Sequence, residues 1–255
     1  MPVHPPTAGP VLAIEASQRD ASVALRLPLA SPERDVIHLE SVGQAGVGED
    51  LVPAIDRLCR RHGVAPQELR VVAVSTGPGG FTGLRVSLAV VKTLGLTTAA
   101  ALVGVRSALV AARSAEDLPL EFRSLCTLLA LKRCGDAVTA WVERFRREPG
   151  DTRWRPEGPA RVRTIAAPPS ANPPDLLQPA DADCFVFDPE PSPEWTDRCA
   201  AAGRPCRPLR LTARDCLLVG EMLLAEGHTV TPSELLPLYA REPEAVTLWK
   251  ARYGA

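Results

Sequence analysis

Apolar residues in the first half of the chain fall into short unbroken runs separated by helical patterns. The unbroken runs predict buried strands at 11–17, 21–27, 71–74 and 102–105, because a strand covered on both faces shows no polar alternation. The more polar run at 35–42 predicts a further strand, and the first two strands form a hairpin across the Gln18–Asp20 turn. Apolar residues at helical spacing predict helices at 49–62, 82–97 and 107–115, the last of them capped by Ser107.

The second half repeats this alternation less regularly. Strands are predicted at 124–132 and 137–145, joined by a turn at 133–136, and again at 161–166 and 184–187. Helices are predicted at 193–202 and, after the capping residue Thr212, at about 212–227. We therefore expect a flexible tail at 1–10, a first lobe at 11–115 that also receives the late helix, a smaller lobe at 116–210 and a tail at 228–255. The five prolines of 167–183 predict a surface linker.

Composition narrows the class of protein. The 255 residues carry a net charge of −1, which gives no global field for a nucleic acid, although a local basic patch stays open. Seven cysteines without a CxxC pair favour reduced thiols, and the N-terminus lacks the pattern of a signal peptide, so we expect a cytoplasmic protein without a membrane span. The four histidines form no HxxxH or HExxH pair, so no metal site is predicted.

One stretch carries the main candidate chemistry. Residues 71–85 read VVAVSTGPGGFTGLR, so that a glycine-rich loop joins a strand to a helix. The N–H groups at the start of such a helix can bind an anion. The alternative is a tight connection whose glycines only allow the backbones to pack. The loop has neither the Gly-Lys-Ser/Thr of a Walker motif nor a GxGxxG fingerprint in register, which favours packing.

The same stretch resembles a known family. GPGGFTGLR is similar to the GPGSFTGLR signature of the TsaB family, with Gly80 in place of the usual serine. The opening VLAIEAS…SVAL resembles the ILAIDTS…SVAL start of that family and of the actin and hexokinase-like superfamily. The segment VGVRSALVAAR and the ending P-x-Y-x-R…W-K are also similar in order. Departures fall at Glu15 (usually Asp), at Val47 and Gly48 (usually His-Ser) and at Leu131 (usually an Asp).

The resemblance implies an α/β fold with two RNase H/actin-like (ASKHA) lobes, each a mixed β-sheet flanked by helices. It implies a partner subunit, not catalytic on its own, that supports a TsaD-type enzyme in forming N6-threonylcarbamoyladenosine at position 37 of tRNA. No cofactor is expected, with ATP an option at the level of the complex. The partners would be a TsaD-like subunit, a TsaE-like ATPase and, for the chain alone, a second copy. Transfer RNA would be met only indirectly.

Candidate residues follow from the loop and the resemblance. The possible anion or nucleotide contacts are Gly77, Gly79, Gly80, Thr82, Gly83, Arg85 and the strand-end Glu15. Glu15 has the alternative role of a carboxylate that accepts turn N–H groups. The helix at 82–97 is apolar nearly all round, which indicates burial in the core, a partner interface, or both. The interface residues would be Leu88, Val91, Thr82 and Arg85.

Other functions stay open. A nucleotide-dependent, kinase-like enzyme would use Glu15 and the loop 77–83. A protease-like activity would need a nucleophile, for which the sequence offers no candidate. A diverged homologue could have lost partner binding. Trp154, between two arginines of the charged segment 146–159, reads as an exposed hairpin tip or, alternatively, as a platform for a base.

Overall fold

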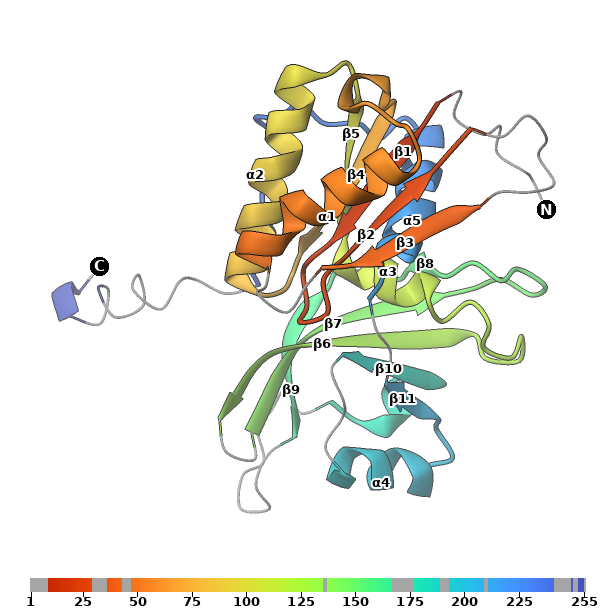
Figure 1. The fold of residues 1–255 in the computed structure, drawn as a ribbon. Helices are drawn as coiled ribbons and strands as arrows, with labels where there is room; N and C mark the ends of the chain where they lie inside the picture. The colour runs from red at the N-terminus through yellow and green to blue at the C-terminus, as the bar shows by residue number, and fades with distance from the viewer. Residues whose placement is uncertain are drawn as a thin grey trace.

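The computed structural model describes residues 9–28, 36–42, 47–134, 137–166, 177–188, 193–208, 211–240, 249 and 252–254. Two β-sheets lie one above the other with helices around them (Figure 1). The predicted fold class, two mixed sheets flanked by helices, is confirmed. No helix in the described ranges is long and apolar enough to cross a bilayer.

The first sheet has the order β3 (Ile37–Ser41), β2 (Ser22–Arg26), β1 (Val11–Glu15), β4 (Val71–Gly77), β5 (Ala101–Arg106). The first three strands pair antiparallel, whereas β1, β4 and β5 run parallel. Every residue of β1 and β2 is buried, which explains their unbroken apolar sequences. The parallel strands end at one edge, and this edge carries Glu15, Gly77 and Arg106.

Helices cover both faces of this sheet. On one face, α1 (Val47–Arg61) and α2 (Phe81–Thr97) lie side by side over Leu12, Ile14 and their neighbours (Figure 1). On the other face lie α3 (Ser107–Arg113) and α5 (Ala213–Ala225). The fit of α5 is close, since a Cβ at Gly220 would lie 2.5 Å from the Ala73 Cβ.

The second sheet has the order β11 (Cys206–Pro208), β10 (Cys184–Asp188), β6 (Ser124–Cys134), β7 (Ala137–Arg146), β8 (Arg155–Pro156), and β9 (Arg161–Ala166) also pairs with β7. Helix α4 (Pro193–Ala201) covers the face that points away from the first lobe (Figure 1). Its Trp195 is buried and meets the Phe185 ring edge-on at 5.6 Å. The opposite face shares a core with α3 and α5. The described residues also include the 3₁₀ turns η1 (Pro66–Glu68) and η2 (Pro179–Asp181).

Several local predictions were wrong. Ser107 does not cap α3, because Arg106 holds the N-cap position and Ser107 is the first helical residue. The predicted turn at 133–136 is partly strand, since β6 continues to Cys134 and β7 starts at Ala137; residues 135 and 136 lie outside the described part. Leu131 lies within β6, where the register shifts between Ala130 and Lys132.

Other outcomes concern the ends and the linker. Thr212 caps α5 as predicted, with its side chain accepting a hydrogen bond from the Asp215 N–H. Within the expected surface linker, Leu177 is fully buried and Ala182 is 3% exposed, so that part is not a surface segment. Residues 167–176, the first part of the expected linker, lie outside the described residues. So do residues 1–8 and 241–248 of the two expected tails. Val47 and Gly48 fall in the first turn of α1.

Candidate functional site

The glycine-rich loop between β4 and α2 lies directly against the turn that follows β1. The Gly80 N–H donates to the Ser17 carbonyl oxygen at 2.7 Å. A Cβ at Gly79 would lie 2.0 Å from that oxygen, and one at Gly83 would lie 2.1 Å from the Ala16 oxygen. Real Cβ atoms do not come within 3.0 Å of such atoms. Gly79 and Gly83 are therefore required so that the start of α2 can approach the β1 turn.

The other side of the loop is covered by residues 235–239. The Leu238 N–H donates to the Thr76 oxygen at 2.7 Å, and Leu235 is 1% exposed in the core under α2. Gly77 has a φ of +104° and a Cβ there would lie 2.8 Å from the Leu238 oxygen. The chain's own backbone thus packs on both sides of the loop.

Glu15 lies at the end of β1, beside this loop, and is 1% exposed. Its Oε1 accepts hydrogen bonds from the Ser17 N–H at 2.8 Å, the Ser17 hydroxyl at 2.5 Å and the Ser75 hydroxyl at 3.0 Å. These are the contacts of a strand-end carboxylate that accepts turn N–H groups. Burial, and then the charge of Glu15, raise the pKa of the nearby Cys216 thiol well above its ordinary value.

Helix α2 has one buried and one exposed face. The buried stripe consists of Leu84, Ser87, Leu88 and Val91. The prediction that Leu88 and Val91 belong to a partner interface was wrong, because they are 3% and 0% exposed and pack in the core between α2, α1 and the sheet. Thr82 and Arg85, the other two predicted interface residues, are exposed.

A cluster of exposed aromatic and arginine side chains forms at the start of α2. The Arg85 guanidinium lies 3.5 Å from the centroid of the Phe81 ring, and its Nε donates to the Tyr239 hydroxyl at 2.9 Å. The Phe81 and Tyr239 rings are stacked with centroids 5.6 Å apart. Phe81 is 48% and Tyr239 38% exposed, and Leu96 at the far end of the helix is 76% exposed. We call this cluster, Phe81, Thr82, Arg85 and Tyr239, together with the separate exposed side chain of Leu96 at the other end of the helix, the α2 patch.

Sequence reasoning missed Phe81 and Tyr239 as site residues. Phe81 belongs to the GPGGFTGLR motif itself, so the signal was present in the sequence. Tyr239 is 154 positions from Arg85, and only the fold shows that the two side chains meet. Tyr239 of the P-x-Y-x-R motif therefore belongs to the same surface as the glycine-rich loop.

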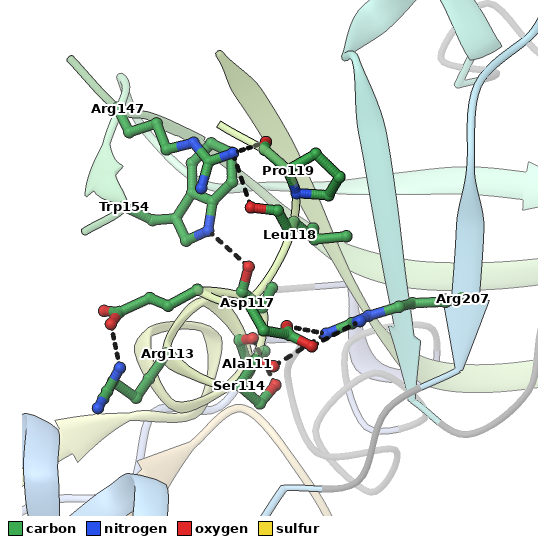
Figure 2. Close-up of polar contacts among 11 residues, drawn as sticks. Ala111, Arg113, Ser114, Asp117, Leu118, Pro119, Arg147, Trp154 and Arg207 are labelled. Carbon is green, nitrogen blue, oxygen red and sulfur yellow. Dashed lines mark hydrogen bonds and ion pairs between the residues drawn. The ribbon is translucent and has the colours of Figure 1, made fainter. Parts of the chain in front are cut away.

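The segment that joins the lobes is held by side chains of the second sheet (Figure 2). The Arg147 guanidinium donates to the Leu118, Pro119 and Phe122 oxygens, and Arg207 pairs with Asp117 at 2.6 Å. The Arg207 ion pair and hydrogen bond lower the pKa of Asp117. These contacts fix the crossing between the lobes.

Trp154 belongs to this crossing, so both interpretations of it from the sequence were wrong. It is 7% exposed, and its Nε1–H donates to the Ala115 oxygen at 3.1 Å (Figure 2). The Arg147 guanidinium covers its ring at 4.2 Å. A side chain held in this way is neither an exposed hairpin tip nor a free platform for a base.

A cavity of about 630 Å³ lies beside the crossing, between α3, α5 and residues 149–154. Its apolar lining includes Leu109 and Met222. Arg113 pairs with Glu116, and Arg153 lies 3.8 Å from Asp151. Burial raises the pKa of Glu116 against the opposing effect of Arg113. Two arginines and two carboxylates balance at this rim, so the charges favour neither an anion nor a cation.

A second link between the lobes starts at the strand edge that carries Glu15. Arg106, at the end of β5, lies 2.6 Å from the Oε1 of Glu143 on β7. Glu143 is 1% exposed, and its Oε2 accepts from the Trp141 Nε1–H at 3.4 Å. The two sheets are thus joined by an ion pair at the carboxyl end of the parallel strands.

Two features of some catalytic centres, a cluster of metal ligands and an activated thiol, are absent from the part of the chain that the structure describes. Among them, no three His, Cys, Asp or Glu side chains gather as metal ligands. Burial raises the pKa of the Cys126, Cys184 and Cys206 thiols to about 12 and also raises those of Cys59 and Cys199. A thiol with a raised pKa is a poor nucleophile at neutral pH.

Comparison with solved structures defines the class of fold. A Pseudomonas aeruginosa protein described as similar to peptidase YeaZ matches with a TM-score of 0.64, at 22% identity over 91% of this chain and all of that one. YeaZ from Pseudomonas aeruginosa matches with a TM-score of 0.63, also at 22% identity, over 91% of this chain and 99% of that one. The chain has the two-lobed, ASKHA-like fold of these proteins.

Comparison with family models shows which family part of the sequence resembles. Residues 47–129 match the family model for TsaD, tRNA N6-adenosine threonylcarbamoyltransferase. The matched segment includes α1, the glycine-rich loop and α2, and ends in β6. The predicted resemblance is thus found in sequence to the TsaD family over residues 47–129, and in fold to YeaZ over 91% of the chain. No curated protein gave a sequence match.

Proposed function

We propose that this chain is a partner subunit of a TsaD-type enzyme in the formation of N6-threonylcarbamoyladenosine on tRNA. The observation that carries the proposal is the α2 patch, which lies in and beside the segment that matches the TsaD family. Exposed large apolar side chains grouped with an arginine are typical of protein interfaces. The patch therefore supports a docking role for this face of the first lobe.

The same geometry supports a chain that does not catalyse alone. Three glycines of the loop are used for contact with Ser17, Ala16 and Leu238, and Glu15 Oε1 is occupied by Ser17 and Ser75. A kinase-like enzyme would need this strand edge for phosphate. The pKa values of the buried thiols argue against a cysteine protease. We therefore favour the scaffold over both enzymatic alternatives.

The remaining partners follow from this role. A second copy of the chain would cover the α2 patch when the enzyme is absent, and the TsaD-type subunit would replace it. A TsaE-like ATPase would join the assembled complex, and ATP would then act at that level. No nucleotide is expected to bind the isolated chain.

Light scattering after size exclusion tests the proposal. The chain is run alone and then mixed with the TsaD-like protein of the same organism, and we expect a new stoichiometric species. Leu96→Glu and Phe81→Glu should weaken it at least tenfold, because both side chains are exposed and can be changed without opening the core. Leu88→Glu and Val91→Glu are unsuitable variants, since both would place a charge in the core.

Leu120→Glu is the matched control, because Leu120 is 45% exposed and lies in the crossing between the lobes, outside the α2 patch. It should form the complex like the unchanged chain. The absence of any complex, with or without ATP, would refute the partner role. A complex unaffected by Leu96→Glu and Phe81→Glu would refute the α2 patch as its site.

A further inference from the structure

Arginine side chains gather on the outer face of the second sheet, at the edge formed by β7, β8 and β9. The sequence has only three lysines, so nearly all of its basic side chains are arginines. This set, which we call the arginine face, consists of Arg144, Arg146, Arg155, Arg161 and Arg163.

Strand register places these side chains on one side of the sheet. Residues directly opposite each other in an antiparallel pair point to the same face. Arg146 lies opposite Arg155, and Arg161 and Arg163 lie opposite Val142 and Ala140. Val142 and Ala140 pack in the core under α4, which identifies the face as the outer one. Arg144 and Arg146 continue the same alternation beyond them, about 7 Å apart.

Trp154 and Arg147 support this assignment from the opposite side. Both point to the crossing between the lobes, where they are 7% and 2% exposed. Their neighbours along the chain, Arg155 and Arg146, therefore point outward, and their side chains are 66% and 63% exposed. Arg144 is 44% exposed.

Among the residues that the structure describes, three carboxylates pair with arginines of the arginine face, which has five. Asp181 forms ion pairs with two arginines: its Oδ1 lies 3.0 Å from the Arg144 guanidinium, and its Oδ2 lies 3.3 Å from that of Arg163. Glu157 lies 2.8 Å from Arg146, and Asp151 lies 3.5 Å from Arg155. Like charges opposite each other, such as Arg146 and Arg155, destabilise a strand pair. An excess of positive charge at a local cost to the sheet indicates a polyanionic partner.

We propose that the arginine face binds the phosphate backbone of tRNA. A guanidinium pairs with phosphate in bidentate geometry, and strands with alternating arginines present several of them in a row. The identity of the RNA as tRNA rests on the proposed function, whereas the phosphate contact rests on the arginines. The role is direct, in place of the indirect contact that the resemblance implies.

The contact would position the RNA without reading its sequence. Phosphate contacts fix orientation, whereas sequence is read from bases. In the second lobe, Trp154 and Trp195 are buried at 7% and 1% exposure, so neither offers a stacking surface for an unpaired base. The chain would hold the body of the tRNA while the TsaD-type subunit receives the modified adenosine.

An anionic membrane is the less suitable partner for this surface. Binding to a bilayer surface needs apolar side chains beside the basic ones. Val162, the exposed apolar residue of β9, lies opposite Trp141 and hence on the other face of the sheet. The chemistry of the outer face therefore favours RNA.

Fluorescence anisotropy with an unmodified, labelled tRNA transcript tests the proposal on the purified chain. Binding is measured between 50 and 200 mM salt for the unchanged chain and for Arg146→Gln/Arg155→Gln. We expect a salt-dependent affinity, weakened about 10- to 30-fold in the double variant at 0.1 M salt, with a salt slope smaller by about 1.5. Arg19→Gln/Arg214→Gln, which removes two exposed arginines of the first lobe, should bind within twofold of the unchanged chain.

The outcomes separate this proposal from the proposed function. Light scattering with the TsaD-like protein should give the same complex for both double variants, because the arginine face lies away from the α2 patch. Loss of tRNA affinity only in Arg146→Gln/Arg155→Gln supports the arginine face even if no such complex forms. Equal losses in both variants, no tRNA binding at 50 mM salt, or binding to phosphatidylserine vesicles but not to tRNA would overturn it.

Discussion

Gly83 in the glycine-rich loop distinguishes packing from anion binding. If the glycine serves packing, its replacement should lower stability, whereas if it serves anion binding, its replacement should lower function and leave stability unchanged. A Cβ at this position would lie 2.1 Å from the Ala16 backbone oxygen, so the start of α2 must move away from the β1 turn in Gly83→Ala. The Gly80 N–H to Ser17 hydrogen bond, 2.7 Å long, would lengthen as a result.

The magnitude follows from three contributions. Forcing extra volume into a packed site costs about 1–3 kcal/mol, and weakening one backbone hydrogen bond costs about 0.5–1.5 kcal/mol. These losses are partly offset, because alanine within a helix is more stable than glycine by about 1 kcal/mol. We expect a net loss of about 1–3 kcal/mol in the free energy of unfolding, measured by urea denaturation followed by circular dichroism. For a chain of this length, 1 kcal/mol corresponds to about 2–4 °C in Tm.

Gly80→Ser is the matched control, three residues earlier in the same loop. A Cβ at Gly80 meets only the Ser17 oxygen at 3.8 Å, which is ordinary contact, and Gly80 is the N-cap of α2. Serine is a preferred N-cap residue, so this variant should be as stable as the unchanged chain or more stable by a few tenths of a kcal/mol. If Gly83→Ala keeps its stability within about 0.5 kcal/mol but loses function, the packing explanation of this glycine is refuted.

Three further predictions concern stability and use the same urea assay. Trp154→Phe removes the donor to the buried Ala115 oxygen and should cost about 1–2 kcal/mol; no loss would contradict its role in the crossing. Thr212→Ala should cost about 1 kcal/mol through the lost α5 cap, whereas Thr212→Ser should cost much less. Burial and the stacked His62 ring, 3.6 Å away, lower the pKa of His38, so stability should fall as pH drops below about 6.5, where the unfolded chain binds the proton more readily. His38→Gln should reduce this dependence.

Most helices and strands could be predicted because their patterns are local. The unbroken apolar runs of β1 and β2 and the helical spacing of α1 were sufficient evidence for these elements. The strands β8 and β11 were missed because two or three residues carry no periodic signal. The cap of α3 was misplaced by one residue, a shift smaller than propensity rules can resolve.

The orientation of α2 could not be read from its sequence. Leu84, Leu88 and Val91 are spaced as a buried stripe, but Val86, Val90 and Leu96 offer competing apolar faces. The close approach of Gly83 to the Ala16 oxygen selects the buried face. Interface residues on such a helix can be chosen only when it is known which apolar stripe packs against the sheet. Tertiary contacts decide this, and the sequence of the helix does not show them.

Trp154 shows the same limit for single residues. Its neighbours Arg153 and Arg155 suggested an exposed segment, yet the indole is fixed by a carbonyl 39 positions earlier. The orientation of the neighbouring arginines follows only from the alternation of side chains along β7 and from its pairing with β8. This register places Arg147 toward the crossing and places Arg146 and Arg155 on the outer face. Burial of Trp154 and exposure of Arg155 are thus two consequences of one strand register.

On the two proposals made above, the two lobes of this chain would serve different purposes. At the carboxyl edge of the parallel strands, the chain fills the space with its own groups: Ser17 contacts Glu15, Leu238 contacts Gly77, and Glu143 of the second sheet contacts Arg106. Of these three contacts, the Arg106–Glu143 ion pair also joins the two lobes. This ion pair would help to keep the α2 patch and the arginine face at a fixed separation, as the proposed docking to an enzyme and contact with its RNA would require.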